Sequence, residues 1–247
     1  MIKVGVVGAR GRMGREVIRA VSEAPDLYVA AEVDLGDDRD ALTECDAVVD
    51  FTQPGAVMDN LRWCVEHDLD VVVGTSGFGE DRLGEVQGWL DDHKAARVLV
   101  VPNFSVGAIL MMRFAEQAAR FFPSAEVIEL HHAAKADAPS GTALRTASMI
   151  GAARAQAGLG PPPDATVSEI PGARGATVDD VHVHSVRVAG LVAHQEVLFG
   201  GQGETLTIRH DSLDRVSFMP GVLLALRNLA SLPEGLTVGL EGLLGLE

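Results

Sequence analysis

Short, almost uninterrupted apolar runs recur through the first hundred residues and alternate with segments whose apolar residues are spaced as on one face of a helix. The apolar runs are residues 2–7, 27–34, 47–51, 70–74 and 97–101. Helical spacing is seen for Met13, Val17, Ala20, Val21 and Ala24, and again for Val57, Leu61, Cys64 and Val65. Apolar strands separated by helices are typical of a parallel sheet that is covered on both faces. The pattern predicts a doubly wound α/β domain.

Past Val101 the pattern changes. A helix-like segment, 105–122, is followed by a strand-like run, 125–130, and a loop rich in Pro and Gly covers 158–175. Three alternating runs then predict neighbouring strands of a mixed or antiparallel sheet: 181–188, 194–200 and 204–210. A final helical segment, 220–232, could pack back on the first domain. We therefore expect a first domain of residues 1–104 joined by 217–247, and a second, α+β domain of residues 105–216.

Three glycines lie where the first predicted strand meets the first predicted helix. Gly8, Gly11 and Gly14 leave room for a pyrophosphate to approach backbone N–H groups, and the helix N-terminus adds a favourable dipole. Asp34 ends the second strand about 20 residues later, where an acid can accept hydrogen bonds from the adenosine ribose. A tight strand–helix turn alone would also explain the glycines, but together with Asp34 they indicate a Rossmann-type dinucleotide domain. The contacts expected from this turn are Gly8, Ala9, Arg10, Gly11, Arg12 and Met13.

Three further loops, residues 51–54, 74–77 and 102–105, are expected to reach the same ligand. The carboxyl ends of parallel strands open on one edge of the sheet, where ligands bind. The loops after the fourth and fifth strands therefore add the following cofactor-binding candidates: Gly74, Thr75, Ser76, Val101, Pro102, Asn103 and Phe104. Ordinary turn chemistry would explain each loop separately.

The cofactor is expected to be NADH or NADPH. Arg10 and Arg12 could contact a 2′-phosphate, whereas Asp34 would repel it. We expect NADH to be favoured and NADPH tolerated.

The stretch HHAAKADAPSGTA, residues 131–143, gathers proton-handling groups beside a helix start. The preceding strand delivers His131 and His132 at its end, and Pro139 rules out a regular helix continuing from Lys135. Ser140 has the position of an N-cap, so Gly141 and Thr142 would present backbone N–H groups that can hold a carboxylate. The stretch predicts a compact positive pocket for a small di-acid.

Lys135 departs from the habit of the chain, in which seventeen of the twenty basic residues are arginine. An ammonium can give up a proton, which a guanidinium effectively cannot, so the lysine at this position suggests a role in proton transfer. Histidines in loops are otherwise most often polar residues satisfied by hydrogen bonds. No metal site is predicted, because neither His131 with His132 and Asp137 nor the pair His182 and His184 has a recognised ligand spacing. The last two are expected on an exposed strand face.

Composition narrows the partners. A net charge of −15 disfavours nucleic-acid binding, and no apolar run is long enough to suggest a membrane span. The start of the chain is a strand leading into the glycine turn and does not resemble a signal peptide. Cys45 and Cys64 lack metal or redox spacing and are expected as reduced, structural thiols. Together these features favour a cytoplasmic protein.

Several motifs resemble one enzyme family. GARGRMG, GTSGF, VPNFSVG and above all ELHHAAKADAPSGTA are similar to the dihydrodipicolinate (4-hydroxy-tetrahydrodipicolinate) reductases, and the similarity continues through LVAHQEVLFGGQGETLTIRHDSLDR and FMPGVLLALRNL. The resemblance covers nearly the whole chain. The sequence departs from the family pattern only slightly: Ser76 stands where threonine is common, and Arg10 and Arg12 stand where basic residues vary.

The resemblance implies an NAD(P)H-dependent reduction of a cyclic dicarboxylate, the dehydrated product of the preceding synthase, to tetrahydrodipicolinate on the diaminopimelate and lysine route. It implies His131 as the acid/base residue and Lys135 as the proton donor, with His132, Gly141 and Thr142 holding the substrate carboxylates. It also implies a homotetramer built through the sheet of the second domain. Two alternatives stay open: another Rossmann-type dehydrogenase acting on a small amino or keto acid, and a nucleotide sensor without activity.

Overall fold

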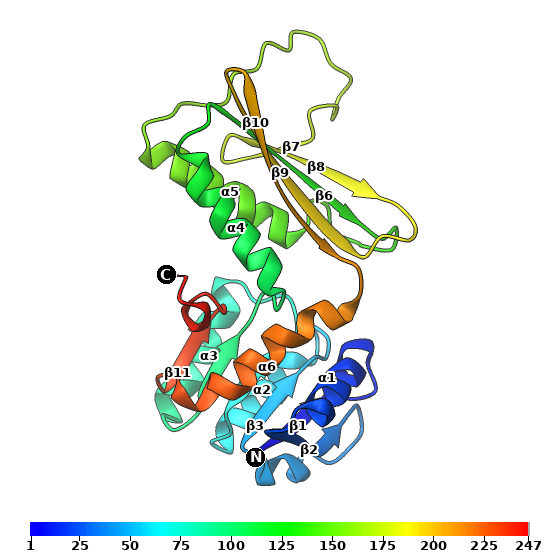
Figure 1. Cartoon of the computed structure of the whole chain (residues 1–247). Coiled ribbons are helices and arrows are strands. Elements are labelled where there is room, and N and C mark those ends of the chain that lie inside the picture. The colour runs from blue at the N-terminus through cyan, green and yellow to red at the C-terminus, as the bar shows by residue number, and fades with distance from the viewer. Residues whose placement is uncertain (247) are drawn as a thin grey trace. The chain divides into compact units, whose positions relative to one another are not determined.

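The computed structural model describes residues 1–246. The chain divides into two compact units, Met1–Ser105 with Arg215–Glu247, and Val106–Asp214, which are described separately (Figure 1). The C-terminal segment therefore belongs to the same unit as the N-terminal half of the chain.

The first unit is built on a six-stranded parallel sheet of order β11-β5-β4-β3-β1-β2. Its strands are β1 (Ile2–Val7), β2 (Leu27–Val33), β3 (Ala47–Asp50), β4 (Val71–Val73), β5 (Arg97–Val100) and β11 (Gly235–Val238). Its helices are α1 (Arg12–Glu23), α2 (Val57–Glu66), α3 (Glu80–Asp92) and α6 (Met219–Asn228), with short 3₁₀ turns η1 (Asp40–Glu44), η2 (Arg215–Phe218), η3 (Leu229–Ser231) and η4 (Gly242–Leu244). The sheet and its helices confirm the predicted doubly wound α/β fold.

Both faces of this sheet are buried, which explains the uninterrupted apolar runs. Val71 and Val73 of β4 share one apolar cluster with Leu61 of α2 and Leu90 of α3. Val72 lies between them on the opposite face and is fully buried as well. The five predicted strands are all present, each ending within a residue or two of its predicted bounds.

The C-terminal segment adds two elements to the first unit. Helix α6 contacts α1, and the Arg227 guanidinium makes two hydrogen bonds of 2.8 Å to the carboxylate of Asp26. Strand β11 pairs in parallel with β5 and was not predicted. Its four residues are too few to show a period, and Gly235, its first residue, and Gly239, which follows it, are both typical of turns.

The second unit contains a five-stranded mixed sheet of order β10-β9-β6-β8-β7, in which only β6 and β8 run parallel. Its strands are β6 (Ser124–His131), β7 (Ala176–Val178), β8 (Val181–Arg187), β9 (Ala193–Gly201) and β10 (Glu204–Ser212), and its helices are α4 (Val106–Ala119) and α5 (Gly141–Gln156). The two helices lie side by side and cover one face of the sheet (Figure 1). The predicted second, α+β fold with a mixed sheet is confirmed.

Two local predictions for the second unit are wrong. Helix α4 ends at Ala119 and not at residue 122. Phe122 precedes Pro123, and the residue before a proline is disfavoured in helical conformation. His182 and His184 are not simply exposed: the Nε2 atom of His184 lies 2.7 Å from a carboxylate oxygen of Glu126, and that of His182 lies 3.6 Å from one of Asp164. An acid of β6 and an acid of the loop before β7 thus lie against these two histidines.

The two cysteines are buried and unpaired with each other, as predicted. Burial raises the pKa of the Cys64 thiol to about 12. None of the helices within residues 1–246 has the length and apolar character needed to cross a membrane.

Candidate active site

The turn between β1 and α1 accepts only glycine at two of its positions. Gly8 has φ +81°, and a Cβ there would lie 2.6 Å from the carbonyl oxygen of Phe51. A Cβ on Gly14 would lie 2.1 Å from the carbonyl oxygen of Gly8. Close approach of the helix to the turn therefore requires both glycines, as the three-glycine pattern predicts.

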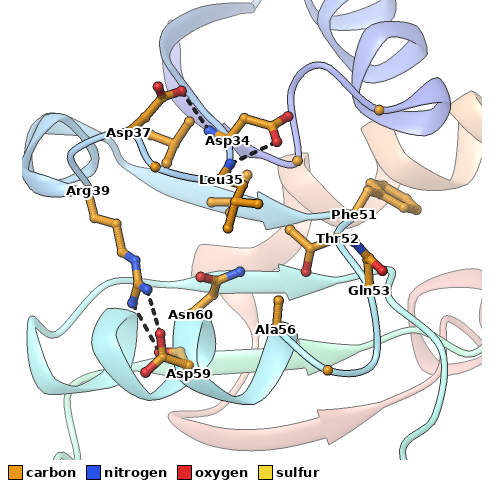
Figure 2. Close-up of a pocket in the computed structure, with 16 residues that line it drawn as sticks. Asp34, Leu35, Asp37, Arg39, Phe51, Thr52, Gln53, Ala56, Asp59 and Asn60 are labelled. Carbon is orange, nitrogen blue, oxygen red and sulfur yellow. Dashed lines mark hydrogen bonds and ion pairs between the residues drawn. The ribbon is translucent and has the colours of Figure 1, made fainter.

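A pocket of about 470 Å³ opens beside this turn (Figure 2). Of the predicted cofactor residues, Gly8, Gly11 and Asp34 line it. The rest of the lining comes from the ends of β1 and β2, the segments after β2 and β3, and α2: Val7, Val33, Leu35, Gly36, Asp37, Arg39, Phe51, Thr52, Gln53, Gly55, Ala56, Asp59 and Asn60. All of these residues belong to the first unit.

Asp34 is tied into the wall of this pocket. One of its carboxylate oxygens accepts the backbone N–H of Arg10 at 2.7 Å and the other accepts that of Leu35 at 2.8 Å. These backbone hydrogen bonds hold the pKa of Asp34 below its usual value. The guanidinium of Arg10 forms an ion pair with Asp37 at 2.7 Å, and Arg39 pairs with Asp59 across the pocket. The pocket near Asp34 thus contains further carboxylates, Asp37 and Asp59, and the two arginines beside them already form ion pairs with these acids.

A buried carboxylate that the sequence analysis missed connects the loops at the sheet edge. Asp50, at the end of β3, is 1% exposed and accepts the hydroxyl hydrogens of Thr52 and Thr75, each at 2.7 Å, and an amide hydrogen of Asn60 at 2.9 Å. Thr75 therefore supports the loop rather than presenting its hydroxyl. An acid at the end of an otherwise apolar strand was the signal available in the sequence.

The remaining predicted cofactor residues lie on the same edge but outside the pocket lining. Phe104 is buried with its ring centroid 5.3 Å from that of Phe51, and a Cβ on Gly74 would lie 2.2 Å from the Phe51 ring. The side-chain oxygen of Asn103 accepts the backbone N–H of Ser105 at 2.8 Å. Ala9 and Val101 are buried, Met13 is half-buried, and Arg12, Ser76 and Pro102 are exposed.

These features fit a dinucleotide. Helix α1 begins after Gly11, whose position as N-cap supplies no side-chain hydrogen bond to the first turn, so the N–H groups of that turn are left for a phosphate. Asp34, the acid that follows β2, lines the same pocket beside this turn. The residues present could therefore hold a nicotinamide dinucleotide by its pyrophosphate and adenosine ribose.

The His-His-Lys stretch lies in the second unit as a loop between β6 and α5. His131 is the last residue of β6, and the backbone N–H of Lys135 donates to the carbonyl of His132 at 3.1 Å, which turns the chain. The hydroxyl oxygen of Ser140 accepts the backbone N–H of Ala143 at 3.2 Å, so the predicted N-cap is confirmed and α5 begins at Gly141. The first turn of α5, with Gly141 and Thr142, therefore follows the loop that carries Lys135.

The sequence predicts a compact positive pocket here, but the positive side chains around this loop are paired with acids. Lys135 forms an ion pair with Asp137 at 2.7 Å, and Arg187, which the sequence analysis missed, forms one with the buried Glu129 at 2.7 Å. The Nδ1 atom of His131 lies 2.5 Å from Glu129. Two positive side chains thus face two negative ones, so affinity for an anion would depend on directed N–H donors more than on net charge.

Glu129 could have been found from the sequence. In β6, residues Ala125 and Val127 alternate toward the buried face, and the same period places Glu129 on that face. Arg187 could not, because its partner lies 58 residues away. Among the described residues 1–246, no group of three or more His, Cys, Asp or Glu side chains is arranged to hold a metal ion.

A Rossmann-type unit with a dinucleotide pocket and a separate unit with a His-His-Lys loop define a nicotinamide-dependent oxidoreductase. The family models for the N-terminus and the C-terminus of dihydrodipicolinate reductase match residues 2–104 and 107–244. The chain belongs to the dihydrodipicolinate reductase family.

Individual relatives agree over the full length. The chain is 62% identical over 247 residues to the 4-hydroxy-tetrahydrodipicolinate reductase of Cutibacterium acnes and 63% identical over 246 residues to that of Thermobifida fusca, with 100% of each chain covered in both cases. Among solved structures, a dipicolinate-bound dihydrodipicolinate reductase from Paenisporosarcina sp. TG-14 superposes with a TM-score of 0.83 at 36% identity, covering 98% of this chain and 99% of that one.

Proposed function

We propose that the chain catalyses the reduction of the cyclic dicarboxylate 4-hydroxy-tetrahydrodipicolinate, by way of its dehydrated form dihydrodipicolinate, to tetrahydrodipicolinate in the diaminopimelate and lysine route. The observation that carries the proposal is the His-His-x-x-Lys loop followed by the capped start of α5, in a chain that matches the reductase family from end to end. The first unit would hold the cofactor and the second the substrate.

The reduced nicotinamide, when bound, supplies the hydride. Gly8, Gly11 and the first turn of α1 would hold the pyrophosphate, and Asp34 would accept hydrogen bonds from the ribose. The loop residues at the sheet edge, from Gly74 to Ser76 and from Val101 to Phe104, would complete the site.

The residues of the second unit would bind the dianion and deliver the proton. His132 and the backbone N–H groups at Gly141 and Thr142 would hold the two carboxylates. Lys135 has three N–H donors, so its ion pair with Asp137 leaves others for the substrate. Lys135 would donate the proton that follows the hydride, with His131 as the acid/base partner.

We further propose that NADH is preferred and NADPH is accepted. The pocket beside Asp34 is also lined by Asp37 and Asp59, and these acids repel a 2′-phosphate. Arg10 and Arg39 would have to leave their ion pairs with Asp37 and Asp59 before either could meet that phosphate.

A homotetramer and a cytoplasmic location complete the proposal. Helices α4 and α5 cover one face of the five-stranded sheet, while the other face carries partly exposed apolar residues that include Ile128 and Leu198. A second copy of the chain would bury them. The two free, buried cysteines are consistent with a reducing compartment.

The test is a direct assay of the purified chain with the product of the preceding synthase and with NADH and NADPH in turn, followed by the absorbance of the reduced nicotinamide. Lys135→Ala should lower kcat by about 10²-fold or more, because a positioned proton donor contributes about 10²–10⁴-fold, while the Kd for NADH stays within about twofold. Lys94→Ala, which removes an exposed lysine of the first unit, is the matched control.

Lack of turnover of the cyclic dicarboxylate by the unaltered chain would refute the proposed activity. Equal losses of turnover and of cofactor affinity in Lys135→Ala would refute the role of the lysine.

A further inference from the structure

Glu129 is a fully buried carboxylate in the second unit. It lies in β6 with 0% of its surface exposed, on the face that carries Val127 and packs against Ala143 and Ala147 of α5. A carboxylate in such surroundings is strongly unfavourable unless it is paired and hydrogen-bonded. Its presence there calls for partners that compensate the burial.

Three segments of the chain supply those partners. Two nitrogens of the Arg187 guanidinium donate to the two oxygens of Glu129, each at 2.7 Å, and the backbone N–H of Ser140 donates at 3.2 Å. The Nδ1 atom of His131 is the fourth contact, at 2.5 Å. The parallel register of β6 and β8 pairs His131 with Arg187, which brings both beside Glu129.

This arrangement selects one form of the His131 ring. An ionised carboxylate only accepts hydrogen bonds, so the proton lies on Nδ1, and Nε2 is the nitrogen left to exchange a proton. Arg187 keeps Glu129 ionised by its bidentate pairing: burial raises the pKa of Glu129, but the hydrogen bonds from Arg187, Ser185 and His131 outweigh it and hold that pKa below its usual value.

The same arginine also holds the loop that carries Lys135. A nitrogen of Arg187 donates to the backbone carbonyl of Asp137 at 2.7 Å, and the side chain of Asp137 pairs with Lys135. One ion pair thus holds the second half of this loop, through the carbonyl of Asp137 and the backbone N–H of Ser140.

We propose that Glu129 and Arg187 form a positioning pair that holds His131 in its Nδ1–H form with Nε2 toward the substrate, and that fixes the Lys135 loop at the same time. This inference rests on the acid/base role of His131 in the proposed function. Neither Glu129 nor Arg187 touches the substrate in this scheme; each acts through His131 or through the loop.

The charges around His131 give the inference a pH signature. Burial lowers the pKa of His131, Glu129 raises it, and Lys135 and Arg187 lower it. Asp137 offsets the charge of Lys135, and β9 faces His131 with the uncharged Ala193. Removal of the Glu129 charge should therefore move the pKa of His131 further down.

The decisive variant is Glu129→Gln, which keeps the shape and removes the charge. We expect kcat to fall by about 10²-fold or more, within the range known for loss of a positioned proton-transfer group, with KM for the dicarboxylate and Kd for NADH within about threefold. The limb of the kcat–pH profile that belongs to His131 should move to lower pH.

Glu126→Gln is the matched control. Glu126 lies on the same strand but on the opposite face, where it pairs with Arg174 and His184. Its loss breaks an ion-pair network of similar size without touching His131, so kcat and its pH profile should stay within about twofold of those of the unaltered chain.

Nitrogen-15 NMR of His131 tests the positioning without turnover. The unaltered chain should show the Nδ1–H form, and Glu129→Gln should lose that preference. Arg187→Lys keeps the positive charge but removes the bidentate hydrogen bonding of the guanidinium, so it should give an intermediate loss of kcat. This variant replaces Glu129→Gln in the test if Glu129→Gln does not fold.

Each outcome bears on the inference in a distinct way. An Nε2–H form in the unaltered chain overturns it, and so does an unchanged Nδ1–H form together with full kcat and an unmoved pH limb in a folded variant of Glu129 or Arg187. A changed ring form together with unchanged kcat overturns the role of His131 in the proposed function and supports the positioning itself.

Discussion

Gly14, the third residue of α1, offers a sharp test of the glycine turn. A Cβ at this position would lie 2.1 Å from the carbonyl oxygen of Gly8, whereas real contacts of this kind stay beyond 3.0 Å. Gly14→Ala therefore forces the helix and the turn apart by about 1 Å. Gly8 has little room to move away, because the backbone of Phe51 lies so close that a Cβ on Gly8 would be 2.6 Å from its carbonyl oxygen.

The magnitude follows from a comparison with a second helical glycine. Gly84 lies in α3, and a Cβ there would meet nothing within 4 Å. The intrinsic gain of alanine over glycine in a helix, about 0.5–1 kcal/mol, is common to both substitutions. The difference between them is therefore the cost of overpacking, so Gly14→Ala should be less stable than Gly84→Ala by about 1–3 kcal/mol.

Cofactor affinity should fall as well. Gly8 and Gly11 line the pocket, and the carbonyl of Gly8 accepts the backbone N–H of Gly11 at 3.0 Å. A shift of about 1 Å would spoil one or two hydrogen bonds from this turn to a charged phosphate, each contributing about 1.5–3 kcal/mol. The Kd for NADH should rise by about tenfold or more in Gly14→Ala and stay unchanged in Gly84→Ala.

Tryptophan fluorescence can follow both effects within the first unit. The two tryptophans of the chain, Trp63 and Trp89, lie in α2 and α3. Urea titrations read by this signal give the stability of that unit, and NADH titrations give Kd. The reasoning is refuted if Gly14→Ala matches Gly84→Ala in stability and the unaltered chain in Kd.

Two further predictions concern the second unit. Ile128→Lys, on the open face of the five-stranded sheet, should reduce the mass found by sedimentation to that of a smaller assembly. Phe121→Lys changes an exposed position just after α4 and should leave that mass unchanged. Equal masses for both variants and the unaltered chain would contradict the proposed assembly. Because Glu129 has a lower pKa in the folded chain than the ordinary value of about 4.5, its contribution to stability is complete above that value and is lost as the pH falls below it. Urea titrations followed by circular dichroism should therefore show a steeper loss of stability between about pH 5 and 3 for the unaltered chain than for Glu129→Gln, and parallel curves would rule this out.

The elements that the sequence could predict are those with a local cause. Strands buried on both faces require continuous apolar runs, so five of the strands of the first unit could be predicted from the sequence. The capped start of α5 depends on Ser140 and the residues next to it, so the loop and the start of the helix could be predicted too. The glycine turn is local in the same sense.

Other features arise only when distant segments meet. Strand β11 becomes a strand because β5 offers it an open edge, and its four residues carry no pattern of their own. Asp50 joins Thr52, Thr75 and Asn60 from separate loops at one sheet edge.

The acid/base loop shows the division most clearly. The sequence by itself determined that His131, His132 and Lys135 precede a capped helix, because those relations are set by neighbouring residues. The tertiary structure decided that Glu129 contacts His131 and that Arg187 compensates its charge, because the register between β6 and β8 brings Arg187 beside an acid 58 positions earlier in the chain. The alternation of β6 places Glu129 on the buried face, but no local pattern identifies Arg187 as the partner that offsets its charge.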